Sequence, residues 1–289
     1  MKSRLLPLAL IAICSFSCSV LENDTPVADK GHKSFYAEIE QPSSLDTKVH
    51  ADKDLKVLWD ADDRIAIFDK YTYGFEYKYI GEPDSNAGEF EQIEVDDDIF
   101  VMGADIDVVC SVYPYDERLS INNSGSVVTL TLPDSQTYLA DSFGKGANTM
   151  ISMGLDTKLA FKNVCGYLAL KFYGDNVSVS SITLKGNNKE MLAGRAQVSV
   201  AVGVDPELSG YKTGKETITL NCPEPVKIGD TAENATVFWF AVPPTTFKGG
   251  FTVTVKDAAG KEFVKSTTRS FEISRNCLSR MAALKAVMD

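Results

Sequence analysis

The sequence predicts an all-β protein with two tandem β-sandwich domains. At about 150 residues per domain, the 289 residues correspond to roughly two domains. Beyond residue 34 the chain consists mostly of short apolar runs bounded by Gly, Pro, Asn or Asp, which is typical of strands joined by turns. Hydrophobic residues make up 44% and charged residues 24%, as in a globular protein. Many short strands with little helix indicate sandwiches or barrels.

Residues 1–17 have the layout of a secretory signal peptide. Lys2 and Arg4 precede an uncharged, mostly apolar run over residues 5–17. This run is shorter than the about 20 residues that a membrane-spanning helix needs. We therefore expect the segment to target the chain for export and then to be removed.

Cys18 follows this segment directly, and Ser17 before it is small. The arrangement resembles the lipobox of bacterial lipoproteins, in which the Cys is acylated and becomes the first residue of the mature chain. It departs from that pattern at Ser15, where an aliphatic residue is usual. Cys14 is the competing site, although Ile13 before it is bulky. An ordinary signal peptide with an incidental Cys is the other alternative.

Residues 18–33 are predicted to be a lipidated Cys followed by a flexible tether. The stretch is polar and contains Pro26 and Gly31. Glu22 and Asp24, close behind Cys18, resemble the surface-export signal of lipoproteins in the Bacteroides group. The expected location is therefore the outer membrane, with the protein facing outward on a lipid anchor.

The first domain is predicted to span residues 34–158. Residues 34–39 read as its first strand, because Phe35, Ala37 and Ile39 alternate with polar or larger residues. Further strands are expected at 64–68, after an acidic turn, and at 108–113 and 127–132. The stretch 133–157 is the least β-like, which places the domain boundary near residue 158.

The second domain is predicted to span residues 159–289. Residues 168–172 alternate with period two, and residues 251–256 turn at 257–260 to return as a hairpin. Residues 237–242 are apolar on both faces, which predicts a central buried strand. In the last segment, residues 276–288, apolar side chains recur at helical spacing, so a short terminal helix is expected there. They are Cys277, Met281, Leu284 and Met288.

Charge and histidine content exclude several function classes. The net charge of −11 repels phosphate backbones, which argues against nucleic-acid binding. The only two histidines, His32 and His50, lie near the N-terminus, which argues against a His-dependent enzyme. Beyond residue 18, four cysteines remain without a C-x-x-C pair, so no structural zinc is expected. One or two disulfides and buried free thiols stay open as alternatives for Cys110, Cys165, Cys222 and Cys277.

Four other groups of residues have a functional and a structural interpretation. Carboxylates beside Trp59 suggest either a hydrolytic pair or an acidic turn, and a second acidic run suggests either a Ca²⁺ ligand set or a solvated loop. An alternating aromatic stripe is either a sugar-stacking surface or the buried face of a strand. A three-residue match suggests either an O-glycosylation signal or a turn. These groups are Asp60, Asp62 and Asp63; Glu94 with Asp96, Asp97 and Asp98; Tyr71, Tyr73, Phe75, Tyr77 and Tyr79; and Asp230, Thr231 and Ala232. The structural interpretation is preferred for the first three groups, and no catalytic, cofactor or metal site is predicted.

Short blocks of strand and turn residues, spread over most of residues 34–280, follow one another in the same order as in a known family. They are Thr47 to Val49, 59–65, Gln136, 148–150, 159–168, 181–186, 192–194, 238–244 and the hairpin at 251–265. In these blocks the chain resembles the fimbrillin-like lipoprotein family of Bacteroidales, to which major and minor fimbrium subunits of type V pili belong. The resemblance implies that both predicted domains are transthyretin-like β-sandwiches.

The resemblance also implies assembly by donor-strand exchange. In type V pili a protease cuts after an Arg near the first strand, and a strand of a neighbouring subunit fills the groove. Here no Arg lies between Cys18 and Arg64, so the candidate processing sites are Lys48, Lys53 and Lys56. Either a different protease acts, or the chain is an uncleaved anchor, tip or non-polymerising relative. The helix expected at the end of the chain further disfavours a stalk pilin.

The leading hypothesis is a non-enzymatic, lipid-anchored surface protein that resembles a structural, anchor or tip adhesion subunit of a fimbrium. Its partners would be other pilus subunits, or a second copy of itself by strand exchange, with a host or bacterial surface ligand as a further partner. The membrane would be contacted through the lipid anchor. The alternative is a surface glycan-binding lipoprotein of a polysaccharide uptake system.

Replacing Cys18 with Ala should release the protein from membranes or leave an unprocessed precursor, because the thiol is the expected acylation site. Membrane fractionation and the mass of the mature chain measure this. The matched control is Cys14→Ala, which should leave anchoring unchanged. Membrane retention of Cys18→Ala at mature size, with loss for Cys14→Ala, would reverse the assignment.

Overall fold

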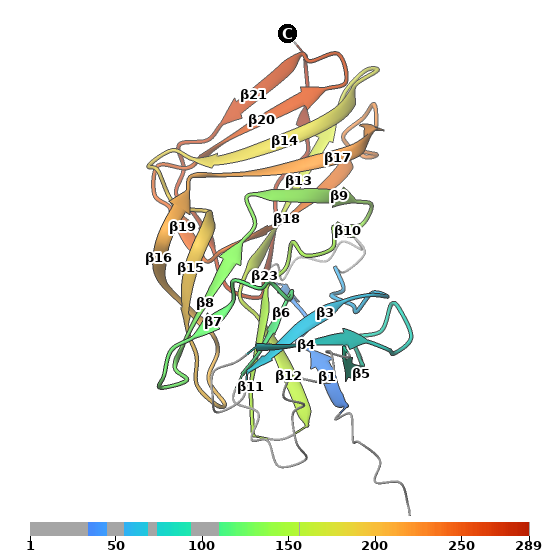
Figure 1. The fold of residues 1–289 in the computed structure, drawn as a ribbon. Coiled ribbons are helices and arrows are strands. Elements are labelled where there is room, and N and C mark those ends of the chain that lie inside the picture. The colour runs from blue at the N-terminus through green and yellow to red at the C-terminus, as the bar shows by residue number, and fades with distance from the viewer. Residues whose placement is uncertain (1–33, 45–54, 69–73, 94–109, 156, 289) are drawn as a thin grey trace, which may run out of the picture. The chain divides into compact units, whose positions relative to one another are not determined.

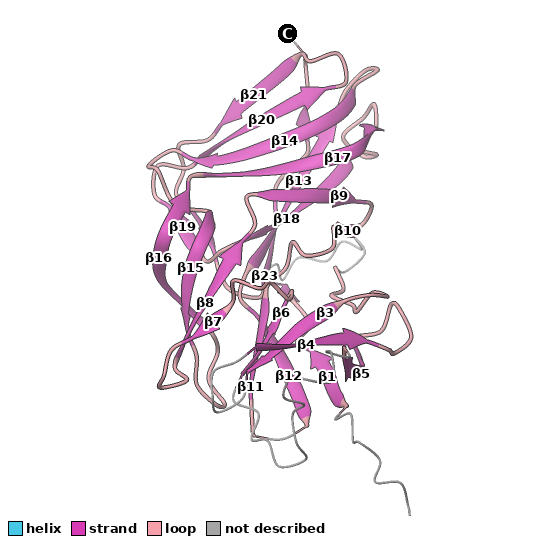
Figure 2. Cartoon of the chain, in the orientation of Figure 1, coloured by secondary structure: helices cyan, strands magenta, loops and turns pink. Residues whose placement is uncertain are grey.

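The computed structural model describes residues 34–44, 55–68, 74–93, 110–155 and 157–288 (Figure 1). All regular secondary structure in these residues is β-strand, and none is helix (Figure 2). The predicted all-β class is therefore confirmed. Within the same residues, no helix has the length and apolar character needed to cross a membrane.

The first sheet is closed on itself. Its strands follow the order β1 (Phe35–Ile39), β12 (Lys158–Asn163), β11 (Met150–Met153), β6 (Cys110–Tyr113), β3 (Arg64–Phe68), β4 (Gly74–Tyr79) and β5 (Ala87–Gln92), and β5 returns to β1. β1 runs parallel to β12 and antiparallel to β5 (Figure 1). The ring is thus completed by the first described strand of the chain.

Four further sheets contain the remaining strands. A six-stranded sheet has the order β10 (Ser142–Phe143), β9 (Ser135–Leu139), β17 (Thr217–Lys227), β14 (Ser178–Gly186), β20 (Phe251–Asp257) and β21 (Glu262–Ser266). Another has the order β18 (Thr236–Val242), β13 (Gly166–Tyr173), β23 (Cys277–Arg280) and β2 (Ser43–Ser44), with β24 (Leu284–Lys285) also on β13. A four-stranded sheet has the order β16 (Glu207–Lys215), β15 (Ala193–Ser199), β8 (Val127–Leu132) and β7 (Ser120–Ile121). β19 (Thr245–Phe247) pairs with β22 (Phe271–Ile273).

Several strands form where the sequence predicts them. β1, β3 and β8 match the expected segments, and β20 and β21 form the expected hairpin. Its turn is held by Asp257, whose carboxylate accepts hydrogen bonds from the N–H groups of Ala259 and Lys261. Gly260 completes the turn at a φ of +82°, in the left-handed region that a glycine adopts without strain.

The strand predicted to be central, β18, lies instead at the end of its sheet and pairs only with β13. Its apolar faces are nevertheless buried, as the sequence indicates. At its free edge the buried Gln136 side chain bonds the main chain of Ala241 in both directions, at 2.7 and 3.1 Å. An amide side chain there replaces part of a neighbouring strand, and so a run that is buried on both faces can end a sheet.

The prediction of a terminal helix is wrong. Residues 277–280 and 284–285 are strands that run parallel to β13. The N–H groups of Met281 and Ala286 donate to Ala169 and Tyr173, so the open edge of β13 satisfies main-chain groups that a helix would have paired locally. The buried side chains are Leu278 and Ala286, which are not on the predicted helical stripe.

Strands on the two sides of residue 158 share sheets. β12 begins at residue 158 and completes a ring whose other strands precede it. β8 pairs with β15, and β9 pairs with β17. The described residues form one compact unit with two buried apolar clusters. A division into domains at residue 158 stays a prediction.

The first apolar cluster is centred on an aromatic group. Trp59 is fully buried, and its ring lies 4.9 Å from Phe90, 5.3 Å from Phe161, 5.4 Å from Tyr113 and 6.1 Å from Tyr79. Most of these contacts are edge-to-face, the arrangement that aromatic quadrupoles favour. The aromatic group ties four strands of the ring to the segment before β3.

The four described cysteines are free thiols. Cys110 and Cys165 are buried, and burial raises the pKa of Cys165 to about 12. Both thiols therefore stay protonated and unreactive at neutral pH.

Thermal unfolding should be nearly unchanged by a reductant, because two apolar clusters of this size bury enough surface without a cross-link. Calorimetry with and without dithiothreitol measures the difference. A loss of more than about 2 kcal/mol on reduction, the scale of a native disulfide, would show that cysteines are bridged.

Candidate functional site

The candidate functional site is β1 with the groove that it fills. Its inward-facing side chains Phe35, Ala37 and Ile39 have exposed fractions of 0%, 0% and 2%. Tyr36 and Glu38 face outward. The predicted alternation of β1 is therefore confirmed, with one strand face buried in the first apolar cluster.

Both edges of β1 are paired along their length. Residues 36–39 align with residues 158–161 of β12, and residues 35–38 align with residues 87–90 of β5. Beyond the strand end, the N–H of Glu40 donates to the carbonyl oxygen of Phe161 at 2.9 Å. Removing β1 would thus leave two open strand edges on either side of an apolar groove.

Two small residues face each other at the centre of the β1–β5 pair. Ala37 lies opposite Gly88 of β5, and a Cβ at Gly88 would come within 2.5 Å of the Tyr79 hydroxyl. That hydroxyl donates to the carbonyl oxygen of Glu82 at 2.7 Å. At the start of the groove, the Phe35 ring packs edge-to-face on Tyr77 with a centroid distance of 5.1 Å.

After β1 the chain is held by a polar cluster that consists of Glu40, Asn163, Asp205, Arg275 and Asn276. Arg275 binds both carboxylate oxygens of Glu40, at 2.6 and 3.1 Å, although the two residues are 235 positions apart. Its other contacts are Asp205 at 2.7 Å and the carbonyl oxygen of Asn163 at 3.0 Å. Burial alone would lower the pKa of Arg275, but the hydrogen bonds to Glu40 and Asp205 raise it above its ordinary value. The guanidinium is therefore a permanent cation between two carboxylates.

Two asparagine side chains complete the polar cluster. Asn163 is fully buried, and its Nδ2 donates to the carbonyl oxygen of Glu40 at 2.8 Å and to Asn276 Oδ1 at 2.7 Å. Its main-chain N–H donates to the Glu40 carboxylate at 3.1 Å. Asn276 Nδ2 donates to the carbonyl oxygen of Gln41 at 3.0 Å. Side chains from β12 and from the segment before β23 thus meet on residues 40–41.

Of the predicted processing sites, only Lys56 lies in the described residues. It is exposed between the buried residues Leu55 and Val57, in a segment without a regular strand. The Gln41 amide bonds the main chain of Val57 in both directions, at 2.9 and 3.2 Å. The predicted lipidation site Cys18 and the predicted sites Lys48 and Lys53 lie outside the described residues.

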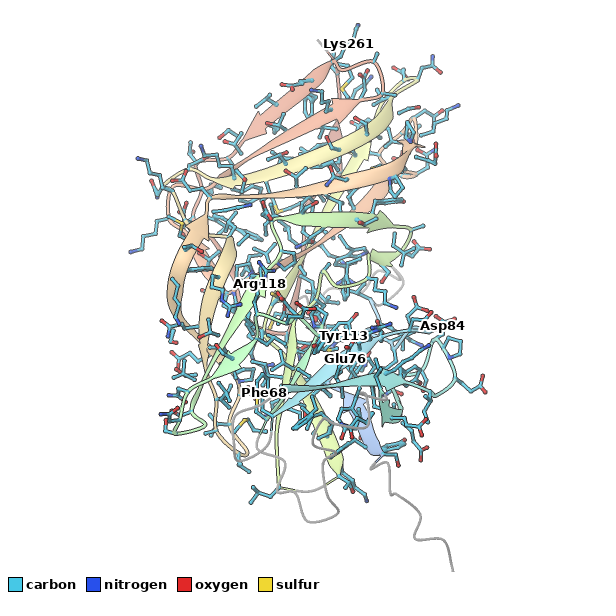
Figure 3. All side chains as sticks on the ribbon, viewed as in Figure 1. Phe68, Glu76, Asp84, Tyr113, Arg118 and Lys261 are labelled. Atoms are coloured by element: carbon cyan, nitrogen blue, oxygen red, sulfur yellow. The ribbon has the colours of Figure 1, made fainter. Side chains whose placement is uncertain are left out.

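The acidic turn before β3 is a structural element. Asp63 is buried, and its carboxylate accepts hydrogen bonds from the hydroxyl of Tyr113 (labelled in Figure 3) at 3.0 Å and from the N–H of Asp60 at 2.8 Å. Lys145 Nζ lies 3.3 Å away. Burial raises the pKa of Asp63 above its ordinary value, against the effect of these partners. Trp59 is buried, so its ring offers no open face for a sugar beside these carboxylates.

The other predicted groups bring no ligand chemistry together in the described residues. Tyr77 and Tyr79 are buried, which confirms the structural interpretation of that part of the aromatic stripe. Tyr71, Tyr73, Glu94 and residues 96–98 lie outside the described residues. Asp230 and Thr231 form a turn closed by Asn234. Among the described residues, no group of three or more His, Cys, Asp or Glu side chains could hold a metal ion.

Sequence reasoning did not single out the residues of the polar cluster. Asn276 begins the segment predicted to be a helix and Arg275 directly precedes it, while Asn163 follows Lys162 in a mostly apolar block. Isolated polar residues at such separations carry no spacing signal. Only the pairing of β1 with β12 and of β2 with β23 brings them to one place.

No protein-family model and no curated protein matches the chain. The chain is similar to a solved structure of a candidate cell adhesion protein from Bacteroides ovatus, with 12% identity, 90% of this chain and 96% of that chain covered, and a TM-score of 0.50. A candidate cell adhesion protein from Bacteroides uniformis has 17% identity, coverages of 78% and 88%, and a TM-score of 0.46. The tip fimbrial protein Mfa3 of Porphyromonas gingivalis, solved with a C-terminal truncation, has 9% identity, coverages of 86% and 94%, and a TM-score of 0.31. The first likeness shows a shared fold.

The stability of the wild-type chain relative to Asp63→Asn should fall as pH rises from about 3.9, the ordinary Asp value. The raised pKa of Asp63 means that the folded chain binds this proton more tightly than the unfolded chain, so ionisation favours unfolding. Urea denaturation of both proteins across this pH range measures the difference.

Asp62→Asn is the matched control for this pH dependence. A hydrogen bond from Lys78 lowers the pKa of the exposed Asp62, so wild-type stability relative to that variant should rise with pH. If wild-type stability relative to Asp63→Asn also rose with pH, the interactions of Asp63 with Tyr113, Asp60 and Lys145 would outweigh the effect of burial on the pKa of Asp63.

Proposed function

We propose that this protein is a non-enzymatic, surface-exposed lipoprotein that acts as a structural or adhesion subunit of a fimbrium and accepts a strand of a neighbouring subunit in place of β1. The observation that carries the proposal is the position of β1, which closes the first sheet between β5 and β12. Fimbrial and cell adhesion proteins are among the solved structures to which the chain is similar. The proposed partners are other pilus subunits or further copies of this chain.

The geometry of β1 supports strand replacement. The strand contributes only three inward side chains, and burial of a large apolar side chain contributes about 1.5–3 kcal/mol. Its pairing is otherwise main-chain hydrogen bonding, which any strand of matching length can supply. Ten residues, 45–54, separate the β1–β2 segment from Leu55, and they include Lys48 and Lys53. Cleavage there would separate this segment from Leu55 without cutting any strand among the described residues.

A second segment of the chain has the same side-chain pattern as β1. In residues 35–40, Phe35, Ala37 and Ile39 are followed by Glu40, and in residues 284–289, Leu284, Ala286 and Met288 are followed by Asp289. Both patterns have a central Ala, which in β1 lies opposite Gly88. Because residues 284–285 form a strand rather than the predicted helix, this segment of a second copy is a suitable donor.

The proposed location is the outer face of the outer membrane, through acylation at Cys18. Support comes from the sequence of residues 1–24 alone. The competing glycan-binding function gains no support from the described residues, because Tyr77 and Tyr79 of the aromatic stripe are buried.

A truncated chain that begins at Val57 should oligomerise or become poorly soluble, because it lacks β1 and exposes an apolar groove between two open edges. The full mature chain should be monomeric. Size-exclusion chromatography of both proteins tests this, together with addition of a synthetic peptide of residues 33–50, which should return the truncated chain to the monomer.

The contrary result is a truncated chain that stays folded and monomeric and ignores the peptide. Donor-strand exchange would then not apply to this protein, and glycan binding would become the leading hypothesis, to be tested on a glycan array.

A further inference from the structure

The apolar pattern of a strand does not by itself define how the strand sits in the β1 groove. A shift of two residues returns the same set of side chains to the same face. Several strands of this chain alternate with apolar residues on one face, among them β14 and β20. Some further contact must therefore decide which strand enters and in which register.

The polar cluster at the end of β1 supplies such a contact. Two guanidinium nitrogens of Arg275 donate hydrogen bonds to the Glu40 carboxylate. Both side chains are largely buried, with exposed fractions of 17% for Arg275 and 28% for Glu40. Two parallel hydrogen bonds of this kind fix both the position and the chemistry of the group that they hold. By contrast, Glu38, two residues earlier on the same strand, is exposed.

Loss of residues 34–44 would leave this cluster unsatisfied. The N–H of Asn163 would lose its carboxylate acceptor, and the Nδ2 groups of Asn163 and Asn276 would each lose a carbonyl acceptor. With the groove filled, Asn163 and Asn276 are 0% and 7% exposed, so an occupant that lacks these acceptors would leave buried polar groups unpaired.

The charges of the cluster select an anion. Arg275 also binds Asp205, and Asp205 binds Lys162 at 2.7 Å. With Glu40 present, two cations face two carboxylates, and without it one positive charge is left over. A strand with a neutral residue at this position leaves that charge unpaired, and a strand with a basic residue is repelled.

We propose that Arg275, together with the main-chain N–H of Asn163, recognises a carboxylate on the strand that fills the β1 groove. The amide side chains of Asn163 and Asn276 hold the main-chain carbonyl groups of that residue and of the next one. The occupant is a strand in which an acidic residue directly follows the third inward-facing apolar residue, and the carboxylate sets its register. This inference rests on the proposed function and names the chemistry of the partner strand.

The experiment uses the full mature chain with a recognition site for a sequence-specific protease placed within residues 45–54. After cleavage, the β1–β2 fragment is held by non-covalent contacts alone. Peptides of residues 34–44 compete with this fragment, and native mass spectrometry measures its replacement. Three peptides are compared. The first is the wild type, the second lacks the Glu40 carboxylate (Glu40→Gln), and the third is the matched control that lacks the Glu38 carboxylate (Glu38→Gln).

The Glu40→Gln peptide should require at least about tenfold higher concentration than the wild-type peptide, because the neutral amide loses the charged hydrogen bonds to Arg275. The Glu38→Gln peptide should match the wild type. In a chain with Arg275→Gln, the difference between wild-type and Glu40→Gln peptides should disappear, which assigns the selection to this contact. The comparison among peptides stands on the wild-type chain if that variant does not fold.

Equal competition by the Glu40→Gln and Glu38→Gln peptides would overturn the recognition of a carboxylate and leave strand replacement intact. The second failure is a cleaved chain that loses its own β1–β2 fragment but binds none of the peptides, the wild-type peptide included. This result would overturn strand replacement and also the inference that rests on it. The two failures are therefore distinguishable in one titration.

Discussion

Closure of the first sheet by β1 is the constraint on which the first apolar cluster depends. β1 is parallel to β12, and a parallel pair cannot be made by a tight turn. Its two partners, β5 and β12, are the two ends of the strand series that the other six strands form. β1 is therefore the strand that joins these ends and completes the ring.

The polar cluster beyond β1 provides hydrogen-bond partners for the main chain where it leaves the closed sheet. Where β1 ends, the main chain leaves the ring at Glu40 and Gln41, and their carbonyl groups lie among buried residues. Asn163 and Asn276 donate to these carbonyl groups, and Arg275 neutralises the Glu40 carboxylate. A buried amide costs free energy unless its partners are present. Residues 40–41 thus supply the partners that these polar side chains use, which links the polar cluster to the packing of β1.

Main-chain groups at strand edges account for both corrections to the sequence analysis. The run at residues 236–242 is buried on both faces and yet ends its sheet, because Gln136 bonds the free edge at Ala241. The segment predicted as a helix follows the open edge of β13 instead. At residues 236–242 the apolar pattern reports burial correctly, whereas in the last segment the buried apolar side chains, Leu278 and Ala286, are not those of the predicted stripe. In both places the partner of the main chain depends on tertiary structure.

The sequence by itself determined the all-β class, the alternation of β1, the hairpin of β20 and β21, and the burial of Tyr77 and Tyr79, because each depends on local side-chain patterns. The prediction that Cys18 carries a lipid anchor also rests on the sequence alone. Only the tertiary structure decided that β1 closes a ring, that β23 and β24 are strands, and that Glu40 meets Arg275. Those features depend on residues as far as 235 positions apart. Side-chain periodicity covers a few neighbouring residues, so it carries no information about contacts at that separation.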